Sequence, residues 1–154
     1  MLTGIHPLLT GRLLWCLDRL GHSDSVVIAD AHFPAARIAA ENAGTVLDFP
    51  AVGSPDMLAA VRTVIPLDDA PALDLMASAS GDVLVVQQEL MRVAGVDAEH
   101  VRFTDRFDFY ETAAGSSVIV RTGETRQYGN VLLRKGLVDP AGDSAPPLRE
   151  GTAS

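Results

Sequence analysis

The first regular pattern in the chain is an apolar stripe with helical spacing. Within residues 10–21 its members are Leu13, Leu14, Leu17 and Leu20. Thr10 can cap the first turn of a helix, and Gly21 can end it. The pattern therefore predicts a short amphipathic helix that packs its apolar face against a core.

The stretch that follows has the character of a buried strand. Residues 25–30 read Ser-Val-Val-Ile-Ala-Asp and are bounded by polar turn residues. A β-branched run without polar alternation is typical of a strand that is covered on both faces. We expect this strand to lie in the middle of a sheet.

Strand and helix patterns then alternate along the chain. Further strands are expected within residues 44–50, 72–78, 100–105, 117–123 and 128–136. Helices are expected from Ser54, which resembles an N-cap before Pro55, within 81–97, closed near Gly95, and within 106–115. The alternation favours an α/β protein: a three-layer α/β/α single domain with a central mixed sheet and helices on both of its faces.

The end of the chain differs from the rest in composition. Residues 139–154 contain prolines, glycines and small polar residues without apolar periodicity. Such a segment cannot bury enough surface to offset the entropy lost on ordering. We predict an α/β domain over residues 1–138 and a flexible C-terminal tail over residues 139–154.

Composition argues against several kinds of partner and location. Of the 154 residues, 47% are hydrophobic and 21% charged, which is typical of a packed globular protein. The net charge is -8 and Lys135 is the one lysine, so binding to nucleic acid is not expected. No stretch has the length or composition of a membrane span or a signal peptide, which predicts a cytoplasmic protein without a membrane partner.

Motifs for nucleotide cofactors and metals are missing from the sequence. It contains neither a glycine-rich phosphate loop nor the Gly-x-Ser-x-Gly turn of serine hydrolases. Four scattered histidines without paired cysteines do not form a structural zinc site. The chemistry that remains is proton transfer by side chains and recognition of a polar ligand.

Candidate functional residues flank the predicted central strand. His22 precedes it, and an imidazole there can change charge near neutral pH, although a solvated turn histidine is the simpler interpretation. Asp30 ends the strand, where ligand-contacting side chains of α/β sheets gather, but it could equally be a turn or cap aspartate. His32 would face the same way as Asp30 and could share a metal with it, yet no third ligand has a recognisable spacing.

Two later segments add polar groups. Arg106 opens the run Arg-Phe-Asp-Phe-Tyr-Glu, and its fork of donors suits a polyhydroxylated ligand; the aromatic residues after it are typical of a helix that packs into a core. A corner made of Tyr128, Gly129 and Asn130 puts a phenol, a permissive backbone residue and an amide side by side. A simple β-turn is the alternative interpretation of that corner.

Together these segments resemble the L-fucose mutarotase and D-ribose pyranase family, and the fucose branch more closely. The resemblance rests on residues 4–9, 21–34, 106–111, 122–130 and 131–136 and covers about residues 1–138. It implies an isomerase that interconverts the α and β anomers of L-fucose or a related monosaccharide, with pyranose–furanose exchange as a further activity.

The resemblance also implies roles for single residues. His22 would be the catalytic proton donor, and Gly129 would contribute backbone groups only. The residues that would bind the sugar are Asp30, Arg106, Tyr128, Gly129 and Asn130. The family implies no metal, no organic cofactor, and homo-oligomers that are commonly decamers of two stacked pentamers.

The positions of His22 and Asp30 raise a geometric difficulty. An extended run from Asp24 to Asp30 spans roughly 20 Å, which is too far for two side chains of one chain to close around a small sugar. We therefore hypothesise that one site combines residues of two subunits. A shorter strand is the alternative.

Other functions stay open at the level of the sequence. The chain could be a non-catalytic monosaccharide-binding or regulatory module of the same fold, a metal-dependent hydrolase or lyase that uses Asp30 and His32, or a purely structural oligomer. Residues 35–53 contain no motif that matches the family, and the physiological sugar is not fixed by the sequence.

Overall fold

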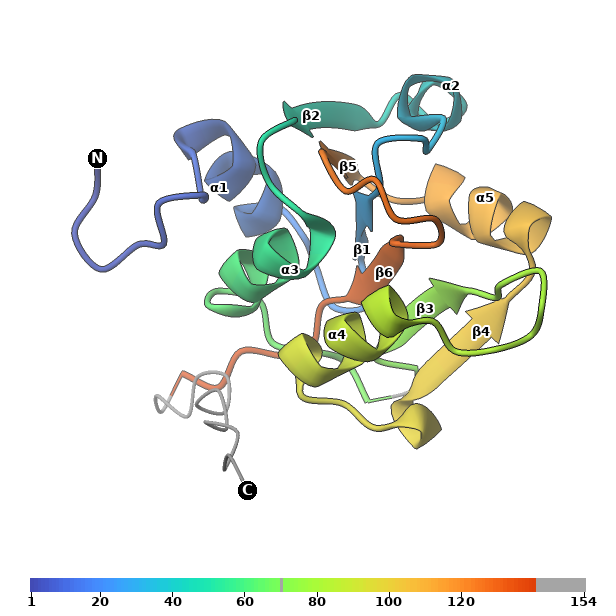
Figure 1. Ribbon diagram of the computed structural model, residues 1–154. Helices are drawn as coiled ribbons and strands as arrows, with labels where there is room; N and C mark the ends of the chain where they lie inside the picture. The colour runs from blue at the N-terminus through green and yellow to red at the C-terminus, as the bar shows by residue number, and fades with distance from the viewer. Residues whose placement is uncertain (70, 141–154) are drawn as a thin grey trace.

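A computed structural model describes residues 1–69 and 71–140, so the predicted tail lies almost entirely outside the described residues. Helices and strands alternate along this part of the chain (Figure 1). The helices are α1 (Gly11–Asp18), α2 (Ala35–Ala40), α3 (Ser54–Arg62), α4 (Val85–Ala94), the 3₁₀-helix η1 (Ala98–His100) and α5 (Arg106–Ala114). The strands are β1 (Ser25–Ala29), β2 (Thr45–Phe49), β3 (Leu73–Met76), β4 (Val101–Thr104), β5 (Val118–Thr122) and β6 (Val131–Arg134).

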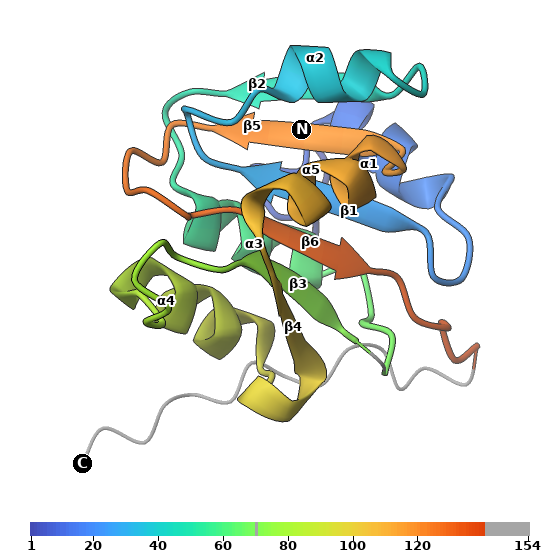
Figure 2. The same cartoon turned by 90° about the vertical axis from the view of Figure 1, so that its right-hand side faces the viewer.

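The described strands form one mixed sheet of six in the order β2-β5-β1-β6-β3-β4, which runs from top to bottom in Figure 2. β1 is parallel to β5, whereas β6 is antiparallel to both of its neighbours, β1 and β3. The predicted interior position of β1 is thus confirmed. Since β1 and β3 run in the same direction, their carboxyl ends lie at the same edge of the sheet.

Helices cover both faces of the sheet, as the alternating pattern predicts. On one face α1, α3 and α4 contribute residues such as Leu17, Leu58 and Leu90 to a core cluster that includes Ile28 of β1. On the other face α2 and α5 pack against the alternate residues of β1. Figure 1 shows the two helical layers with the sheet between them. The chain is therefore an α/β/α sandwich, and the sequence-based fold is confirmed.

The helix boundaries differ from the sequence prediction at three points. Helix α2 was not expected, because its short alanine-rich run carries no side-chain cap. The N-cap of α3 is Gly53 rather than Ser54, which is the first helical residue. Helix α4 begins only at Val85, but it ends as expected at Gly95, which adopts a left-handed backbone with φ of 72°.

The outer face of α1 carries the chain's single tryptophan. Thr10 caps this helix by accepting a hydrogen bond from the Leu13 backbone N–H, as predicted. Trp15 is 57% exposed, and the Arg19 guanidinium lies 4.6 Å from its ring centroid. Among the described residues no helix is both long and apolar enough to cross a membrane.

Candidate functional site

A pocket of about 380 Å³ opens at the edge of the sheet where β1 and β3 end. A cavity of this size is in the range that small-molecule sites occupy. Its lining comes from segments that are far apart in sequence: Asp30, His32, Phe33, Met76, Arg106, Tyr110, Gln127, Tyr128 and Asn130. Four of the five predicted sugar-binding residues therefore meet around one cavity.

Asp30 and Asn130 form a reciprocal pair at the base of the pocket. Each is only 3% exposed. The Asn130 side-chain amide donates to Asp30 Oδ2 at 2.9 Å, and its oxygen accepts from the Asp30 backbone N–H at 2.8 Å. Asp30 Oδ1 accepts from the His32 backbone N–H at 3.0 Å. These contacts leave each side chain with a single orientation.

Burial has an electrostatic consequence for Asp30. Desolvation raises the pKa of its carboxyl above the ordinary value, against the hydrogen bonds from His32 and Asn130, which favour the charged form. A carboxylate so placed gains from hydroxyl donors that enter the pocket, because they replace the solvation lost on burial. Asp30 thus suits a ligand that is rich in hydroxyl groups.

The corner between β5 and β6 brings a phenol to the pocket. Tyr128 adopts a left-handed backbone with φ of 62°, a conformation that non-glycine residues rarely adopt and that the surrounding structure must hold in place. Gly129, the middle residue of this corner, is buried. Within the described chain Gly129 does not belong to the pocket lining, unlike its neighbours Tyr128 and Asn130.

Helix α5 contributes a cation and an aromatic surface. Asp105 caps the helix by accepting from the Phe107 and Asp108 backbone N–H groups, and this cap sets Arg106 at the first helical position. Tyr110, one turn later, lies edge-on to Phe33 with ring centroids 5.4 Å apart. The expected packing of aromatic residues into the core holds for Phe109, which is fully buried.

Several lining residues were not singled out for sugar binding from the sequence. His32 was considered only as a metal ligand, and no group of three or more potential metal ligands occurs among residues 1–69 and 71–140. Met76 ends β3 and is almost fully buried, so its residue type and position suit a core residue equally well. Tyr110 and Gln127 carry no signal that separates them from ordinary helix and loop residues.

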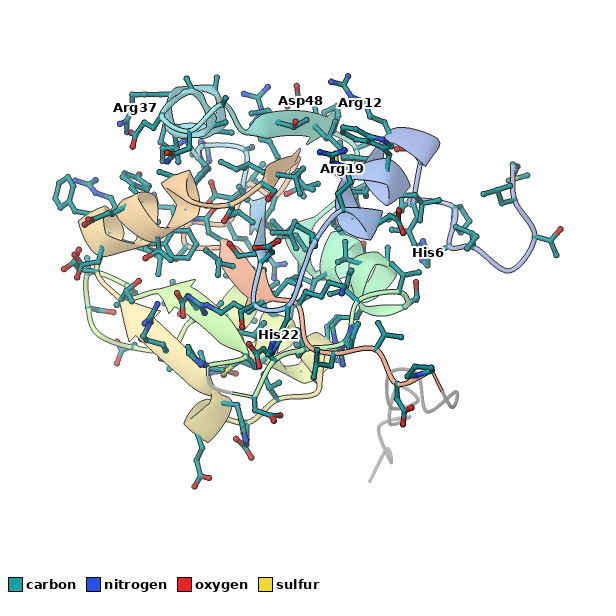
Figure 3. The ribbon with its side chains drawn as sticks, turned by 180° about the vertical axis from the view of Figure 1, so that it is seen from behind. His6, Arg12, Arg19, His22, Arg37 and Asp48 are labelled. Carbon is teal, nitrogen blue, oxygen red and sulfur yellow. The ribbon has the colours of Figure 1, made fainter. Side chains whose placement is uncertain are left out.

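His22 lies elsewhere, in the exposed turn between α1 and β1 (Figure 3). Its Nε2 is 3.5 Å from Oδ1 of Asp68, and the Ser23 hydroxyl donates to Oδ2 of the same carboxylate. That hydroxyl is the main cause that lowers the pKa of Asp68, so an anion faces the imidazole. Because β1 separates His22 from Asp30, His22 does not line the pocket that the described residues form.

Residues 3–138 match the family described as the RbsD / FucU transport protein family. The chain belongs to the RbsD/FucU family. Among RbsD/FucU relatives, a protein named fucose mutarotase from Danio rerio is 36% identical over 150 residues, covering 91% of this chain and 96% of its own length. A fucose mutarotase from Homo sapiens is 35% identical over 147 residues, with coverage of 89% and 94%.

Solved RbsD/FucU structures share the fold. The crystal structure of the fucose mutarotase in complex with L-fucose from Streptococcus pneumoniae has a TM-score of 0.80 and 32% identity, covering 90% of this chain and 100% of the other. Bacillus subtilis RbsD complexed with D-ribose, at 20% identity and a TM-score of 0.68 over 87% of this chain and 98% of its own, shares the architecture.

Proposed function

We propose that this protein is a sugar mutarotase, an isomerase that interconverts the α and β anomers of L-fucose or a related monosaccharide. The observation that carries this proposal is the convergence of Asp30, Arg106, Tyr128 and Asn130 on one pocket. The relatives named fucose mutarotase, and the relative whose structure contains L-fucose, support the same activity.

The reaction needs two proton movements and no electron sink. One proton leaves the anomeric hydroxyl while another reaches the ring oxygen, and the hemiacetal C–O bond breaks to give the open-chain aldehyde. Rotation about the adjacent C–C bond and reclosure give the other anomer. Groups that transfer protons in such a step contribute about 10²–10⁴-fold to the rate.

The pocket residues divide the work of holding the sugar. Asp30 accepts hydrogen bonds from hydroxyl groups, Asn130 can donate or accept, and Tyr128 donates through its phenol. The Arg106 guanidinium offers a fork of donors, and the rings of Phe33 and Tyr110 offer apolar surface to the C–H groups of the sugar. A site that pairs hydroxyl groups discriminates their configuration more sharply than it discriminates a methyl group, so related sugars are accepted.

His22 supplies the proton donor from a second copy of the chain. An imidazole side chain can both give and take a proton near neutrality, and Asp68 Oδ1 lies 3.5 Å from the Nε2 of His22. The separation of His22 and Asp30 at opposite ends of β1 supports a site that is completed between two subunits. Each chain then contributes His22 to one pocket and Asp30 to another.

Mixed oligomers test this arrangement directly. His22→Ala and Asp30→Asn are each expected to be inactive as homo-oligomers. Co-expressed at equal levels, they should recover about a quarter of the wild-type sites, because one pocket in four receives both intact residues. Failure to recover activity in oligomers shown by native mass spectrometry to contain both variants would contradict a shared site.

The activity itself is tested by saturation-transfer NMR between the anomers of L-fucose and of D-ribose. We expect the wild-type protein to accelerate anomer exchange, and the His22→Ala substitution to lower the catalysed exchange rate by at least about 100-fold. Exchange no faster than in buffer would reject the proposal. The decameric assembly, the cytoplasmic location and the domain limits at residues 1–138 stay predictions.

A further inference from the structure

Behind the sugar-binding corner lies a buried carboxylate with no assigned role. Glu124 is 6% exposed and follows β5, at the start of the loop that ends in Tyr128 and Asn130. It does not belong to the lining of the pocket in the described structure. A nearly buried carboxylate persists only where several donors compensate its lost hydration.

The Glu124 side chain collects donors from its own loop and from α3. Its Oε1 accepts from the Arg126 backbone N–H at 3.0 Å and from Arg126 Nε at 2.9 Å, and its Oε2 accepts from Arg126 Nη2 at 2.9 Å. The Ser54 backbone N–H, at the start of α3, makes a smaller contribution that also favours the charged form of this carboxylate. Side-chain hydrogen bonding to Arg126 is the main cause that lowers the pKa of Glu124, so it is charged at neutral pH.

The Glu124 backbone ties the corner to the other wall of the pocket. Its carbonyl oxygen accepts from the Ala31 N–H at 2.8 Å, next to Asp30. Its own N–H donates to Thr122 Oγ1, whose hydroxyl donates to the Ala29 carbonyl at the end of β1. One residue therefore connects the chain segment that carries Asp30 with the segment that carries Tyr128 and Asn130.

Gly129 shows how closely the corner fits over Glu124. A Cβ at position 129 would lie 2.8 Å from Glu124 Cγ and 3.3 Å from Ser54 Oγ. The absence of a side chain thus lets the corner close over the carboxylate stem. This contact gives Gly129 a function that needs no direct contact with the sugar.

We propose that Glu124 is a positioning residue of the sugar site, which holds Tyr128 and Asn130 in register with Asp30 through Arg126, the α3 N-terminus and the close contact with Gly129. The inference rests on the proposed function for its effect on catalysis, but its effect on Tyr128 can be measured without sugar. Tyr128 depends on such support because its backbone occupies a strained region.

Glu124→Gln and Glu89→Gln form a matched pair of variants. Glu89 accepts from the outer side of the same Arg126 guanidinium at 3.1 and 3.0 Å, but it lies on α4. The amide of Glu124→Gln keeps the size of the side chain and presents a donor where the carboxylate accepted. We expect its apparent KM for L-fucose to rise about 5-fold or more with kcat changed less, and Glu89→Gln to stay within about 2-fold of wild type.

The direct readout is ¹⁹F NMR of protein labelled with 3-fluorotyrosine. The chain has two tyrosines, and both Tyr110 and Tyr128 line the pocket; Tyr110→Phe assigns the signals. In the sugar-free protein we expect Glu124→Gln to shift or broaden the Tyr128 signal and to leave the Tyr110 signal in place. A loss of stability alone would move neither signal of the folded protein.

Two results would overturn the proposal. One is a folded Glu124→Gln protein with wild-type KM and an unchanged Tyr128 signal. The other is a change in KM and in the Tyr128 signal that is equally large in Glu89→Gln, which would assign the effect to the surface ion pair between Glu89 and Arg126. If Glu124→Gln does not fold, Gly129→Ala perturbs the same contact, because its Cβ would lie 2.8 Å from Glu124 Cγ. This variant must then alter the Tyr128 signal. An unaltered Tyr128 signal in Gly129→Ala would also reject the role of Glu124.

Discussion

Asp30 accepts the strongest hydrogen bonds from sugar hydroxyl groups when it is charged, yet it is almost fully buried. The structure resolves this conflict through donors from His32 and Asn130, which offset only part of the desolvation that raises the pKa of Asp30. The pocket therefore contains a carboxylate that has given up hydration and gains hydrogen bonds when a hydroxylated ligand binds. The pH dependence of binding should reveal this property.

We expect the affinity for L-fucose to fall as the pH is lowered. This fall should begin at a higher pH than it would if the aspartate had its ordinary pKa. Because the pKa of Asp30 is raised in the folded state, its carboxylate takes up a proton at a higher pH than a free aspartate and becomes a weaker acceptor for sugar hydroxyl groups. Protonation also removes the free-energy cost of burying the charge, so the contribution of Asp30 to folding stability rises as the pH falls. Dissociation constants from NMR titrations against pH measure the effect.

His32 is the control, since its charge lies next to Asp30. A His32→Gln variant should retain the acidic loss of affinity, whereas Asp30→Asn should bind weakly with little pH dependence. Wild-type affinity that stays flat to about pH 4 would contradict the assignment to Asp30.

Among the predicted residues that line the pocket, Asp30, Tyr128 and Asn130 combine polar chemistry with a place next to a strand end. Asp30 follows the most apolar strand, and Tyr128 and Asn130 precede β6, so local pattern and the family resemblance identify them. Tyr110 and Met76 reach the same cavity through the folding of α5 and β3. Since their types and spacing suit a core equally well, no local signal separates them from core residues.

At the scale of the element, the start of α3 shows how a helix can be capped from a distance. Ser54 has the residue type of an N-cap, yet its hydroxyl is buried without a hydrogen-bond partner in the described part of the chain. The Ser54 N–H instead favours the charged form of the Glu124 carboxylate, which belongs to a distant loop. A long-range contact of this kind leaves no trace in the local sequence.

Ser54→Ala should therefore leave the free energy of unfolding unchanged or raise it by up to ~1 kcal/mol, because an unsatisfied hydroxyl is removed. Thr10→Ala removes a hydroxyl that does accept a hydrogen bond, from the Leu13 backbone N–H, and should lower the free energy of unfolding by about 0.5–2 kcal/mol. Urea unfolding curves of both variants give the comparison. An equal loss in the two would mean that Ser54 does cap its helix.

The strands were predictable and α2 was not, for a physical reason. Val26, Val27 and Ile28 are β-branched and buried, and that composition has few other uses. Helix α2 begins after Pro34 without a side-chain cap and is six residues long, so too few turns repeat for a periodicity to show.

Across the whole molecule, one buried charge joins three strands. Asp74 of β3 is fully buried and accepts bidentate hydrogen bonds from Arg134 of β6 and from Arg102 of β4. Burial would raise the pKa of Asp74, but the two guanidinium groups outweigh it and the pKa is lowered. This half of the sheet is thus held by ionic contacts as well as by the backbone ladder.

Asp74→Asn should lower the free energy of unfolding by up to about 3–5 kcal/mol at neutral pH, because Arg134, only 15% exposed, and the half-exposed Arg102 lose their counter-charge. Since the folded-state pKa is depressed, the wild-type stabilisation is present above the unfolded-state pKa and is lost as the pH falls through the folded-state value. The difference between the two proteins should therefore shrink in acid.

Denaturant unfolding at several pH values tests this, with Asp48→Asn as the matched control. Asp48 pairs with Arg121 between side chains that are 54% and 44% exposed, and exposed pairs contribute at most about 1 kcal/mol. A similar cost for the two substitutions would show that burial of Asp74 adds nothing.

Trp15 has a practical consequence at this scale. It stands on the solvent side of α1, across the sheet from the layer formed by α2 and α5, with a guanidinium over its ring. Its fluorescence emission therefore reports on what touches the outside of α1 and is blind to ligand in the same chain's cavity. Dilution and sugar titration, followed by that emission, would separate association of copies from occupancy of the cavity in a single cuvette.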